Sequence, residues 1–565
     1  MANFPGVTVM GGRVSRRLLA LGAAGILLGS TVACGGGKSS TAAADRILNV
    51  FSGANTGFVA NFNPFSQNSL VGTDSMLYEA LMYFNGGKAD DVQPQLATAY
   101  TFGDSGKSLT FTLRDGVKWS DGQPFSAQDV AFTFNLLKDN TKTNLQGLPV
   151  TGATATDQTH VTVTFSQPVY TRLMLIAGRT WIVPEHIWSK VTDASAYTND
   201  KPVGTGPFVV KSVSPQSYLY ARNPHYWDAG KPKIAGIRFH QYNGNDSAIA
   251  ALAAGQLDWT GLFIADIDKQ YVAKDSKDNK YLNESQLYVT NLIPNLAKAP
   301  FNDPAVRKAV SLAIDRDQLI KLAFSGYGKP ASPVELPRPL YDDYIKPEYQ
   351  NLTLPYNQQQ AEQTLQQAGY TKGADGFYAK GGKRLSFTVK VVQGYSDYIS
   401  ALQIMTQELK SAGIELKTQQ ESFTAFSTDQ QTGNFDVIIT NLYADGPNPY
   451  SWYERAFAGW TTKPLGQEAG SNYGRFRDST VDQALTAIQA LPPDQKDAIK
   501  AQLFKAEDVI VAQQPYIPIQ QSSALIEYRT NNFTNFPTEQ NHYALATPFN
   551  GPDIGIVAKN LEPVG

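Results

Sequence analysis

Cys34 is the only cysteine in the 565-residue sequence. A thiol can pair in a disulfide, bind a metal as a thiolate or attack a substrate as a nucleophile, so its position decides which of these reactions is open. Cys34 ends a short apolar segment and is followed by three glycines. Because no thiol follows it, the chain beyond Cys34 has no internal disulfide, thiolate metal site or catalytic cysteine.

The residues before Cys34 have the features of an export signal. A basic region precedes an apolar run at about 18–32, and its charges are Arg13, Arg16 and Arg17. A run of roughly 15 residues is too short for a permanent membrane span, but is typical of a cleaved signal. Residues 31–34 resemble a bacterial lipobox, with threonine where leucine is commonest. We expect a signal peptide at 1–34, exported by the Sec or the twin-arginine route, and lipidation of Cys34.

Residues 35–45 predict a flexible linker because they consist mainly of Gly, Ser, Thr and Ala. Each acyl methylene on Cys34 would contribute about 0.8 kcal/mol of membrane affinity. The expected location is therefore extracytoplasmic, on a bacterial cell membrane, with the folded part free to move.

The rest of the chain lacks familiar catalytic patterns. Gly-x-Ser-x-Gly, His-Glu-x-x-His and lysine-containing phosphate loops are absent. The five histidines form no close pair at metal-ligand spacing, and they are His160, His186, His225, His240 and His542. Acidic pairs occur in any chain of this length and are uninformative. We predict a binding protein without catalytic residues, metal or cofactor, and keep a secreted hydrolase as the alternative.

Length and pattern predict a mixed α/β protein of two or three lobes, since 565 residues exceed one core. Alternating residues at 109–113 and 161–165 predict half-buried strands, as do those at 385–389. Helical patterns occur at 74–83, 303–324 and 399–412. Ser126 with Asp129 predicts a helix N-terminus. The net charge of −2 gives no basic surface for nucleic acid.

Six segments occur in an order that characterises one protein family. The most specific is Phe-Thr-Leu-Arg-Asp-Gly-Val-Lys-Trp-Ser-Asp-Gly-Gln-Pro-Phe at 111–125, followed by 127–130. The others are 182–188, 204–208, 222–227, 301–309 with 313–316, and 433–436. Together they resemble the family 5 solute-binding proteins of ABC importers, the dipeptide, oligopeptide and nickel group. Trp119 within the first segment is expected to be a core residue.

The resemblance implies a periplasmic-binding-protein-like fold of type II, in which two hinged lobes close over a ligand. The first lobe would comprise 46–95, 199–289 and 491–565, with a subdomain inserted at 96–198. The second lobe would span 290–490, and the glycines at 204 and 206 would give the backbone freedom where the chain leaves the subdomain. The implied partners are ABC permease subunits with cytoplasmic ATPases, served by a monomer. A receptor that signals without transport remains open.

Asp445 is the first candidate for ligand binding. It follows an apolar strand at 437–440, and the resemblance places it where peptide-binding members hold the peptide's ammonium group. An aspartate that caps the Gly-Pro turn is the alternative. Asn472, Tyr473 and Arg475 lie in a segment that also lines the family's cleft. Arg475 would pair with a ligand carboxylate or with Asp478.

The segments 61–66, 77–85, 258–264 and 447–453 resemble those of the family branch that binds cello- and chito-oligosaccharides. Sugar rings stack on aromatic faces, and amides bind their hydroxyls. Trp259 and Trp452 could stack on sugar rings, and Asn61 and Asn63 could bind sugar hydroxyls. The alternative is that both tryptophans are packing residues. Peptides are the predicted ligand, with β-linked oligosaccharides as the alternative, and the scattered histidines disfavour nickel or haem.

Overall fold

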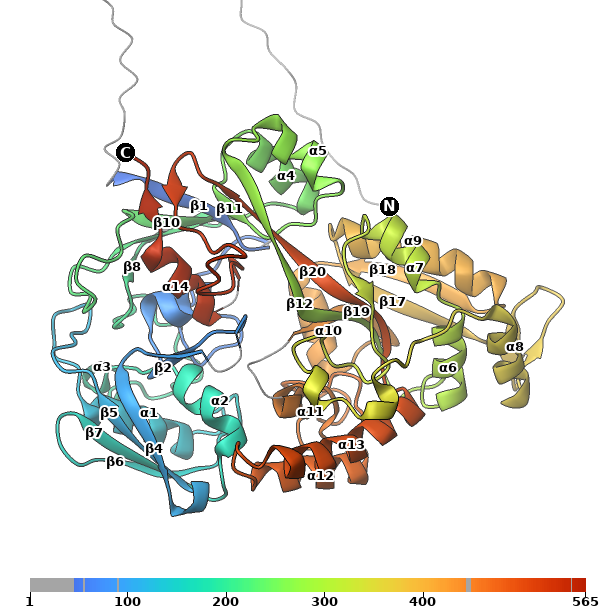
Figure 1. Ribbon diagram of the computed structural model, residues 1–565, viewed down its shortest axis with the longest axis horizontal. Coiled ribbons are helices and arrows are strands. Elements are labelled where there is room, and N and C mark those ends of the chain that lie inside the picture. The colour runs from blue at the N-terminus through green and yellow to red at the C-terminus, as the bar shows by residue number, and fades with distance from the viewer. Residues whose placement is uncertain (1–44, 54–55, 89–90, 444–448, 550) are drawn as a thin grey trace, which may run out of the picture. The chain divides into compact units, whose positions relative to one another are not determined.

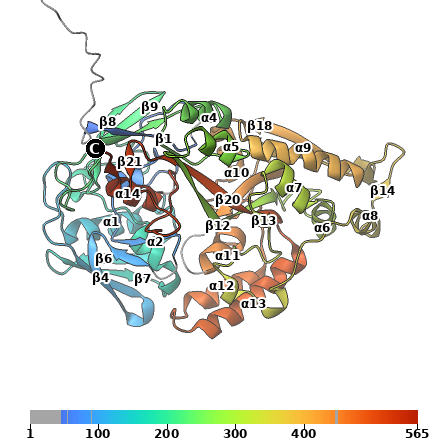
Figure 2. The ribbon, with the colours of Figure 1, turned by 45° about the horizontal axis from the view of Figure 1, so that its top comes forward.

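The computed structural model describes residues 45–565 except 54–55, 89–90, 444–448 and 550. Within these residues an 11-stranded sheet runs through two lobes in the order β18-β17-β19-β12-β20-β11-β1-β10-β9-β8, with β13 paired to β20. Figure 1 shows β12 and β20 crossing from one lobe to the other, and Figure 2 shows this crossing from another side. The predicted two-lobed α/β fold is confirmed.

The two crossing strands are long and antiparallel. β12 (Asn279–Pro294) and β20 (Ile517–Arg529) pair along most of their length, with register shifts near the middle of β12. At one end β20 pairs with β11 (Trp259–Thr260), and at the other β12 pairs with β19 (Val437–Tyr443). Each strand therefore belongs to both lobes, which is the arrangement expected of a hinge.

Lobe I has a base sheet whose central strand β1 (Ile47–Phe51) is parallel to both of its neighbours. Buried Leu48 and Val50 face one core, and Phe51 faces a smaller one. The remaining base elements are β8 (Phe208–Val213), β9 (Ser217–Arg222), β10 (Gly236–His240), α4 (Asn245–Ala253), α5 (Ile267–Gln270) and α14 (Gly551–Asn560).

A second sheet in lobe I lies in the inserted region, in the order β4-β5-β7-β6. Its elements are β4 (Ala97–Gly103), β5 (Ser108–Leu113), β6 (Val150–Ala155), β7 (His160–Phe165), α1 (Ala127–Asp139), α2 (Leu173–Gly178) and α3 (Glu185–Trp188). Ser126 and Asp129 form the predicted capping box of α1, and Trp119 is a fully buried core residue. This core is continuous with that of the base.

Gly204 and Gly206 lie where the chain leaves the inserted region, but positive φ angles are not the reason for them. A Cβ at Gly204 would lie 1.9 Å from the Leu77 carbonyl oxygen, and one at Gly206 would lie 2.4 Å from that of Met76. Any larger residue would therefore clash with backbone. Close packing against residues 76–77 replaces the predicted conformational freedom as the cause.

Lobe II is built on β17 (Ser386–Val392), β18 (Glu415–Glu421) and β19, which are parallel to one another. Apolar side chains on both faces of β17 and β19 pack into two separate cores. One core holds α6 (Pro304–Leu312), α7 (Arg316–Ala323), α8 (Gln358–Gln367) and α9 (Ser396–Ser411). The other holds α10 (Phe423–Thr432), α11 (Pro449–Phe457), α12 (Ser479–Gln489) and α13 (Lys496–Gln513).

The chain returns to lobe I later than the expected position at residue 491. Ile499, Leu503 and Ile510 of α13 pack in the same core as α11 and α12. The return occurs along β20, so α13 is part of lobe II.

The remaining strands are short. They are β2 (Met82–Phe84) with β3 (Val92–Pro94), β13 (Lys329–Pro330), β14 (Thr371–Lys372) with β15 (Tyr378–Lys380) and β16 (Lys383–Arg384), and β21 (Phe533–Thr534) with β22 (Glu562–Pro563). In the described part of the chain, no helix has the length and apolar character needed to cross a membrane.

Candidate functional site

The lobes meet through a buried ion pair. Arg172, directly before α2 of lobe I, places Nη2 2.5 Å from Oε1 of Glu454 on α11 of lobe II. The two side chains are only 8% and 10% exposed. The Arg172 guanidinium also donates to the carbonyls of Gln146 and Gly147. A charge pair at this depth loses much of its hydration, so it favours contact only when its hydrogen bonds are well satisfied.

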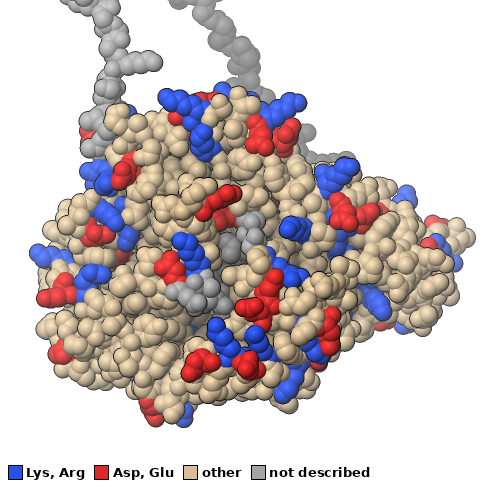
Figure 3. Space-filling model, viewed as in Figure 1, with Lys and Arg blue, Asp and Glu red and all other residues tan. Residues whose placement is uncertain are grey.

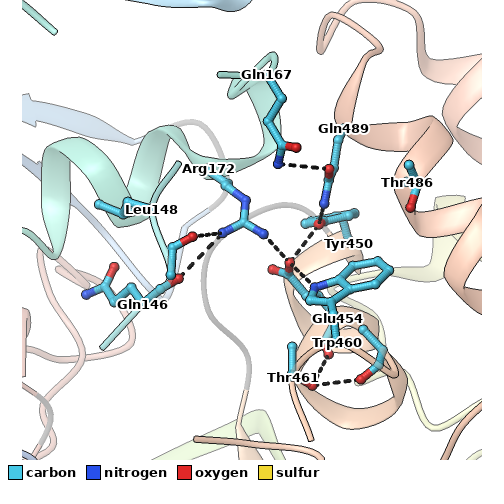
Figure 4. A network of polar contacts seen from close by, with 12 residues as sticks. Gln146, Leu148, Gln167, Arg172, Tyr450, Glu454, Trp460, Thr461, Thr486 and Gln489 are labelled. Atoms are coloured by element: carbon cyan, nitrogen blue, oxygen red, sulfur yellow. Dashed lines mark hydrogen bonds and ion pairs between the residues drawn. The ribbon is translucent and has the colours of Figure 1, made fainter. Parts of the chain in front are cut away.

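Further polar groups surround this pair, and Figure 4 shows them converging on Glu454. Its Oε1 also accepts from the Tyr450 hydroxyl at 2.8 Å and from Trp460 Nε1 at 3.1 Å. Gln489 donates to the Tyr450 oxygen at 2.7 Å and accepts from Gln167 of lobe I at 3.3 Å. We call Arg172, Glu454, Tyr450, Gln489 and Gln167 the interlobe latch. It holds α2 against α11 and α12.

Other hydrogen bonds also join the lobes. Gln431 of α10 donates to Gln67 Oε1 at 2.9 Å. Asn245, the first residue of α4, donates to Ser396 Oγ, the first residue of α9, at 3.2 Å. The surface between these contacts is where a two-lobed protein encloses a ligand, because closure there removes the ligand from water. On the face shown in Figure 3, acidic and basic side chains are interspersed, without a large area of one sign.

A hydroxyl-rich cluster lies beside the crossing strands. Thr290 of β12 donates to Asn441 Oδ1 of β19 at 2.9 Å and is hydrogen-bonded to Ser522 of β20. Tyr398 of α9 donates to the same Asn441 oxygen. Thr290, Ser522 and Tyr398 are buried, whereas Asn441 is exposed. We call these four residues the hinge cluster.

Among the predicted ligand residues, Asp445 lies outside the described residues, as does Cys34. Asn472 is buried in a turn, where its amide donates to the carbonyls of Ala458 and Phe476 and its Oδ1 accepts from the Phe476 amide. These bonds leave Asn472 little capacity for a ligand.

Arg475 is buried close to Asn472. It donates to the carbonyl of Gln431 at 2.6 Å, and burial lowers its pKa. It does not bridge to Asp478, which instead caps α12 and accepts from Gln513. Half-buried Tyr473 donates to the Gly470 carbonyl at 3.1 Å.

The two predicted stacking residues lie in different cores. Trp259 is fully buried in lobe I, where its Nε1 donates to the Ala546 carbonyl at 2.7 Å. Trp452 is buried in lobe II, and its Nε1 has no hydrogen-bond partner in the described part of the chain. Neither ring offers a face to solvent. Trp460 does, since it is 39% exposed, and its place beside Glu454 makes it a stacking candidate that sequence reasoning missed.

Asn61 and Asn63 organise one loop of lobe I. Buried Asn63 donates to the carbonyls of Ala194 and Tyr197, both at 2.8 Å. Half-buried Asn61 donates to Ser66 Oγ at 3.0 Å and accepts from the Asn63 amide. Their positions close to Gln67, which contacts lobe II, keep them near the interlobe surface.

The described residues include no group of three His, Cys, Asp or Glu side chains arranged to hold a metal ion. His542 is instead paired with buried Glu284 of β12 at 2.9 Å, and this carboxylate raises the pKa of His542. The interlobe contacts described above are hydrogen bonds and the Arg172–Glu454 ion pair.

Known proteins resemble this chain in sequence or in fold. Protein XP55 of Streptomyces lividans is 26% identical over 405 residues, which cover 70% of each chain. The glutathione-binding protein GsiB of Escherichia coli is 26% identical over 471 residues, covering 78% of this chain and 82% of that protein. The mannohexaose-bound periplasmic oligopeptide-binding protein of Thermotoga maritima superposes with a TM-score of 0.84 at 24% identity, covering 92% of this chain and 99% of that one.

The family-level match extends over most of the chain and includes both lobes. The sequence model described as "Bacterial extracellular solute-binding proteins, family 5 Middle" matches residues 91–463. That range contains the inserted region of lobe I, β12, and Tyr450 and Glu454 of the latch. The chain belongs to the family 5 bacterial extracellular solute-binding proteins.

Proposed function

We propose that this protein captures peptides between its two lobes and delivers them to the permease of an ABC importer. The observation that carries the proposal is the pair of crossing strands combined with the interlobe latch. Two strands allow the lobes to rotate, and the latch forms only when they meet. A ligand that contacts both lobes would therefore favour the latched state through its differential affinity for that state.

The choice of peptides is supported by the names of similar proteins. GsiB is a glutathione-binding protein, and glutathione is itself a tripeptide. The Thermotoga protein is named for oligopeptides. Asp445 is the residue we propose for the peptide ammonium group, since a single carboxylate shielded from water forms a strong charge-assisted hydrogen bond with it.

Oligosaccharides are the second candidate. The Thermotoga structure contains mannohexaose. In this chain the exposed ring of Trp460, with its indole nitrogen held by Glu454, would suit a pyranose face. If sugars are the ligand, Trp460 is the residue on which they stack.

A thermal-shift and calorimetric screen separates the two candidates. Glutathione, tri-alanine and mannohexaose would each be added to the purified protein. A ligand at a hundredfold its Kd stabilises the native state by about 2.7 kcal/mol. We expect the peptides to raise Tm, and Asp445→Asn to abolish this effect. A shift with mannohexaose alone, lost in Trp460→Ala, would establish the sugar reading.

We also propose that Cys34 anchors the protein to the outer side of the cell membrane. Cys34→Ser should prevent incorporation of labelled fatty acid and move the protein from the membrane fraction to the soluble fraction. Retention of label in this variant would contradict the anchor. The binding measurements do not depend on this outcome.

A further inference from the structure

The side-chain amide of Asn441 is held in one orientation by its neighbours. Its Oδ1 accepts two hydrogen bonds, from the hydroxyls of Thr290 and Tyr398. A carbonyl oxygen can accept from two hydroxyls at once. Because Oδ1 faces both hydroxyls, Nδ2 is directed away from Thr290 and Tyr398.

The outward group has unused capacity. Asn441 is exposed, and Nδ2 donates no hydrogen bond to any residue in the described part of the chain. An amide nitrogen carries two N–H groups. The hinge cluster thus presents a donor on an amide that two hydrogen bonds hold in place, and a preorganised donor loses less entropy on binding.

The donor also lies at the junction of the lobes. Thr290 and Ser522 belong to the crossing strands β12 and β20. Tyr398 is in the first turn of α9, two residues beyond Ser396, which accepts the hydrogen bond from Asn245 of lobe I. Asn441 itself is near the end of β19. Of the four elements that meet here, β12 and β20 pass between the lobes, α9 contacts lobe I, and β19 pairs with β12.

We propose that Asn441 is a ligand-binding residue, which donates from Nδ2 to an uncharged oxygen acceptor of the captured solute. On the proposed function, on which this inference rests, the acceptor is a peptide carbonyl. A sugar hydroxyl has the same acceptor chemistry. Thr290 and Tyr398 are positioning residues that act through Asn441.

Two substitutions of Asn441 test the donor. Asn441→Asp keeps an oxygen for Thr290 and Tyr398 but replaces the donor with an acceptor, whereas Asn441→Ala removes the donor without adding charge. Affinity would be measured by calorimetry on the full chain with glutathione, tri-alanine and mannohexaose. Loss of one hydrogen bond predicts about fivefold weaker binding in Asn441→Ala, and the repulsion in Asn441→Asp predicts at least about tenfold. Exposed Asn351→Asp adds the same charge elsewhere in lobe II and should leave Kd unchanged.

The positioning role has a readout of its own. Tyr398→Phe removes one of the two bonds that orient the amide, and about threefold weaker binding is expected. The same substitution should have no further effect on Kd in the Asn441→Ala background, because there is no amide left to orient. A purely structural Tyr398 would lower Tm equally in both backgrounds and leave Kd unchanged.

The outcomes are separable. If glutathione or tri-alanine binds the unaltered chain and both Asn441 variants bind it equally well, the inference is wrong and the proposed function stands. If mannohexaose alone binds and the variants weaken it, Asn441 is confirmed as a donor and the peptide assignment fails. If none of the three binds, both proposals are overturned.

Discussion

Two buried ionic clusters of similar exposure have different consequences because of where they lie. Lys390 of β17 bonds to Glu421 of β18 at 2.8 Å and to Asp429 of α10, so all three residues are within lobe II. Their side chains are 11%, 10% and 19% exposed. The interlobe latch pairs Arg172 with Glu454 at comparable depth, but across the lobes.

The two clusters differ in the motion that can bring water to an unpaired carboxylate. Loss of Lys390 would strand two carboxylates in a lobe that can expose them only by unfolding. Loss of Arg172 would strand Glu454 at a surface that the lobes can expose simply by moving apart. We therefore expect the first cluster to determine folding stability and the second to determine the equilibrium between latched and open states.

The largest effect is expected from Lys390→Met. Burial alone would lower the pKa of Lys390, but its hydrogen bonds to the two carboxylates raise it, so the cation is strongly favoured here. Its removal should cost about 3–5 kcal/mol of unfolding free energy, measured by urea denaturation. Lys417→Met is the matched control, since Lys417 is 61% exposed and only 3.5 Å from Glu415. A loss below about 1 kcal/mol in Lys390→Met would break the comparison.

Glu527 sharpens the comparison, because the nearest groups to this buried carboxyl are neutral. It accepts from Thr260 Oγ1 at 2.6 Å and from the Leu262 amide at 3.1 Å, and burial raises its pKa to about 8. The folded state therefore keeps a proton that the unfolded chain releases near pH 4.5. Its contribution to stability is complete below pH 4.5 and is lost as pH rises through about 8.

Glu527→Gln should remove this pH dependence, because glutamine stays neutral. The fall in unfolding free energy between pH 5 and pH 8 should be smaller by at least about 2 kcal/mol than in the unaltered protein. Thermal melts at four pH values would measure it. Parallel stability–pH curves for the two proteins would show that Glu527 is not the titrating group.

Arg172→Met tests the latch. Ligand affinity should fall at least about tenfold, equivalent to about 1.4 kcal/mol, mainly through faster dissociation. Unfolding free energy should change less than in Lys390→Met, because open lobes hydrate Glu454. Adding Glu454→Gln should restore part of the affinity. Stopped-flow measurement of glutathione release gives the dissociation rate. An unchanged dissociation rate would show that the latch does not retain the ligand.

The smallest effect is expected from Arg384→Met. Arg384 pairs with Asp375 and Glu415 on the surface of lobe II, where it is 43% exposed. Exposed pairs contribute about 0–1 kcal/mol, so neither Tm nor Kd should change appreciably. A large loss of Tm or affinity in Arg384→Met would mean that burial and location within or between lobes do not explain the effects of the other variants.

Local features of the fold were predictable from sequence. The Ser126 capping box starts α1 where expected, and the alternating residues at 109–113 and 161–165 form β5 and β7. The prediction of a helix at 74–83 was wrong, because Ser75 adopts a φ of 69° and bonds to the backbone of Gly551 and Gly555. Contacts with residues more than 470 positions away overrode the local preference.

The site was less predictable for the same reason. Arg172 and Glu454 are 282 residues apart, and neither lies in a distinctive motif. Glu454 stands two residues after Trp452, which sequence reasoning singled out for its ring. Asn472 and Arg475 were predicted to line the ligand cleft, but their side chains bond to nearby carbonyls. A residue type indicates what chemistry is possible, and only the neighbours show whether it is already used.

The path of the chain through β12 and β20 has a consequence for biosynthesis. Lobe II is one continuous stretch, so a ribosome completes it before lobe I, whose sheet starts with β1 but whose core also needs α14. Tyr83 must wait for Asp553, to which it donates at 2.6 Å. The nascent chain therefore carries an unfinished first lobe throughout the synthesis of the second. During this time residues 45–278 cannot complete their core, so they would remain accessible to a transport machine that threads extended polypeptide.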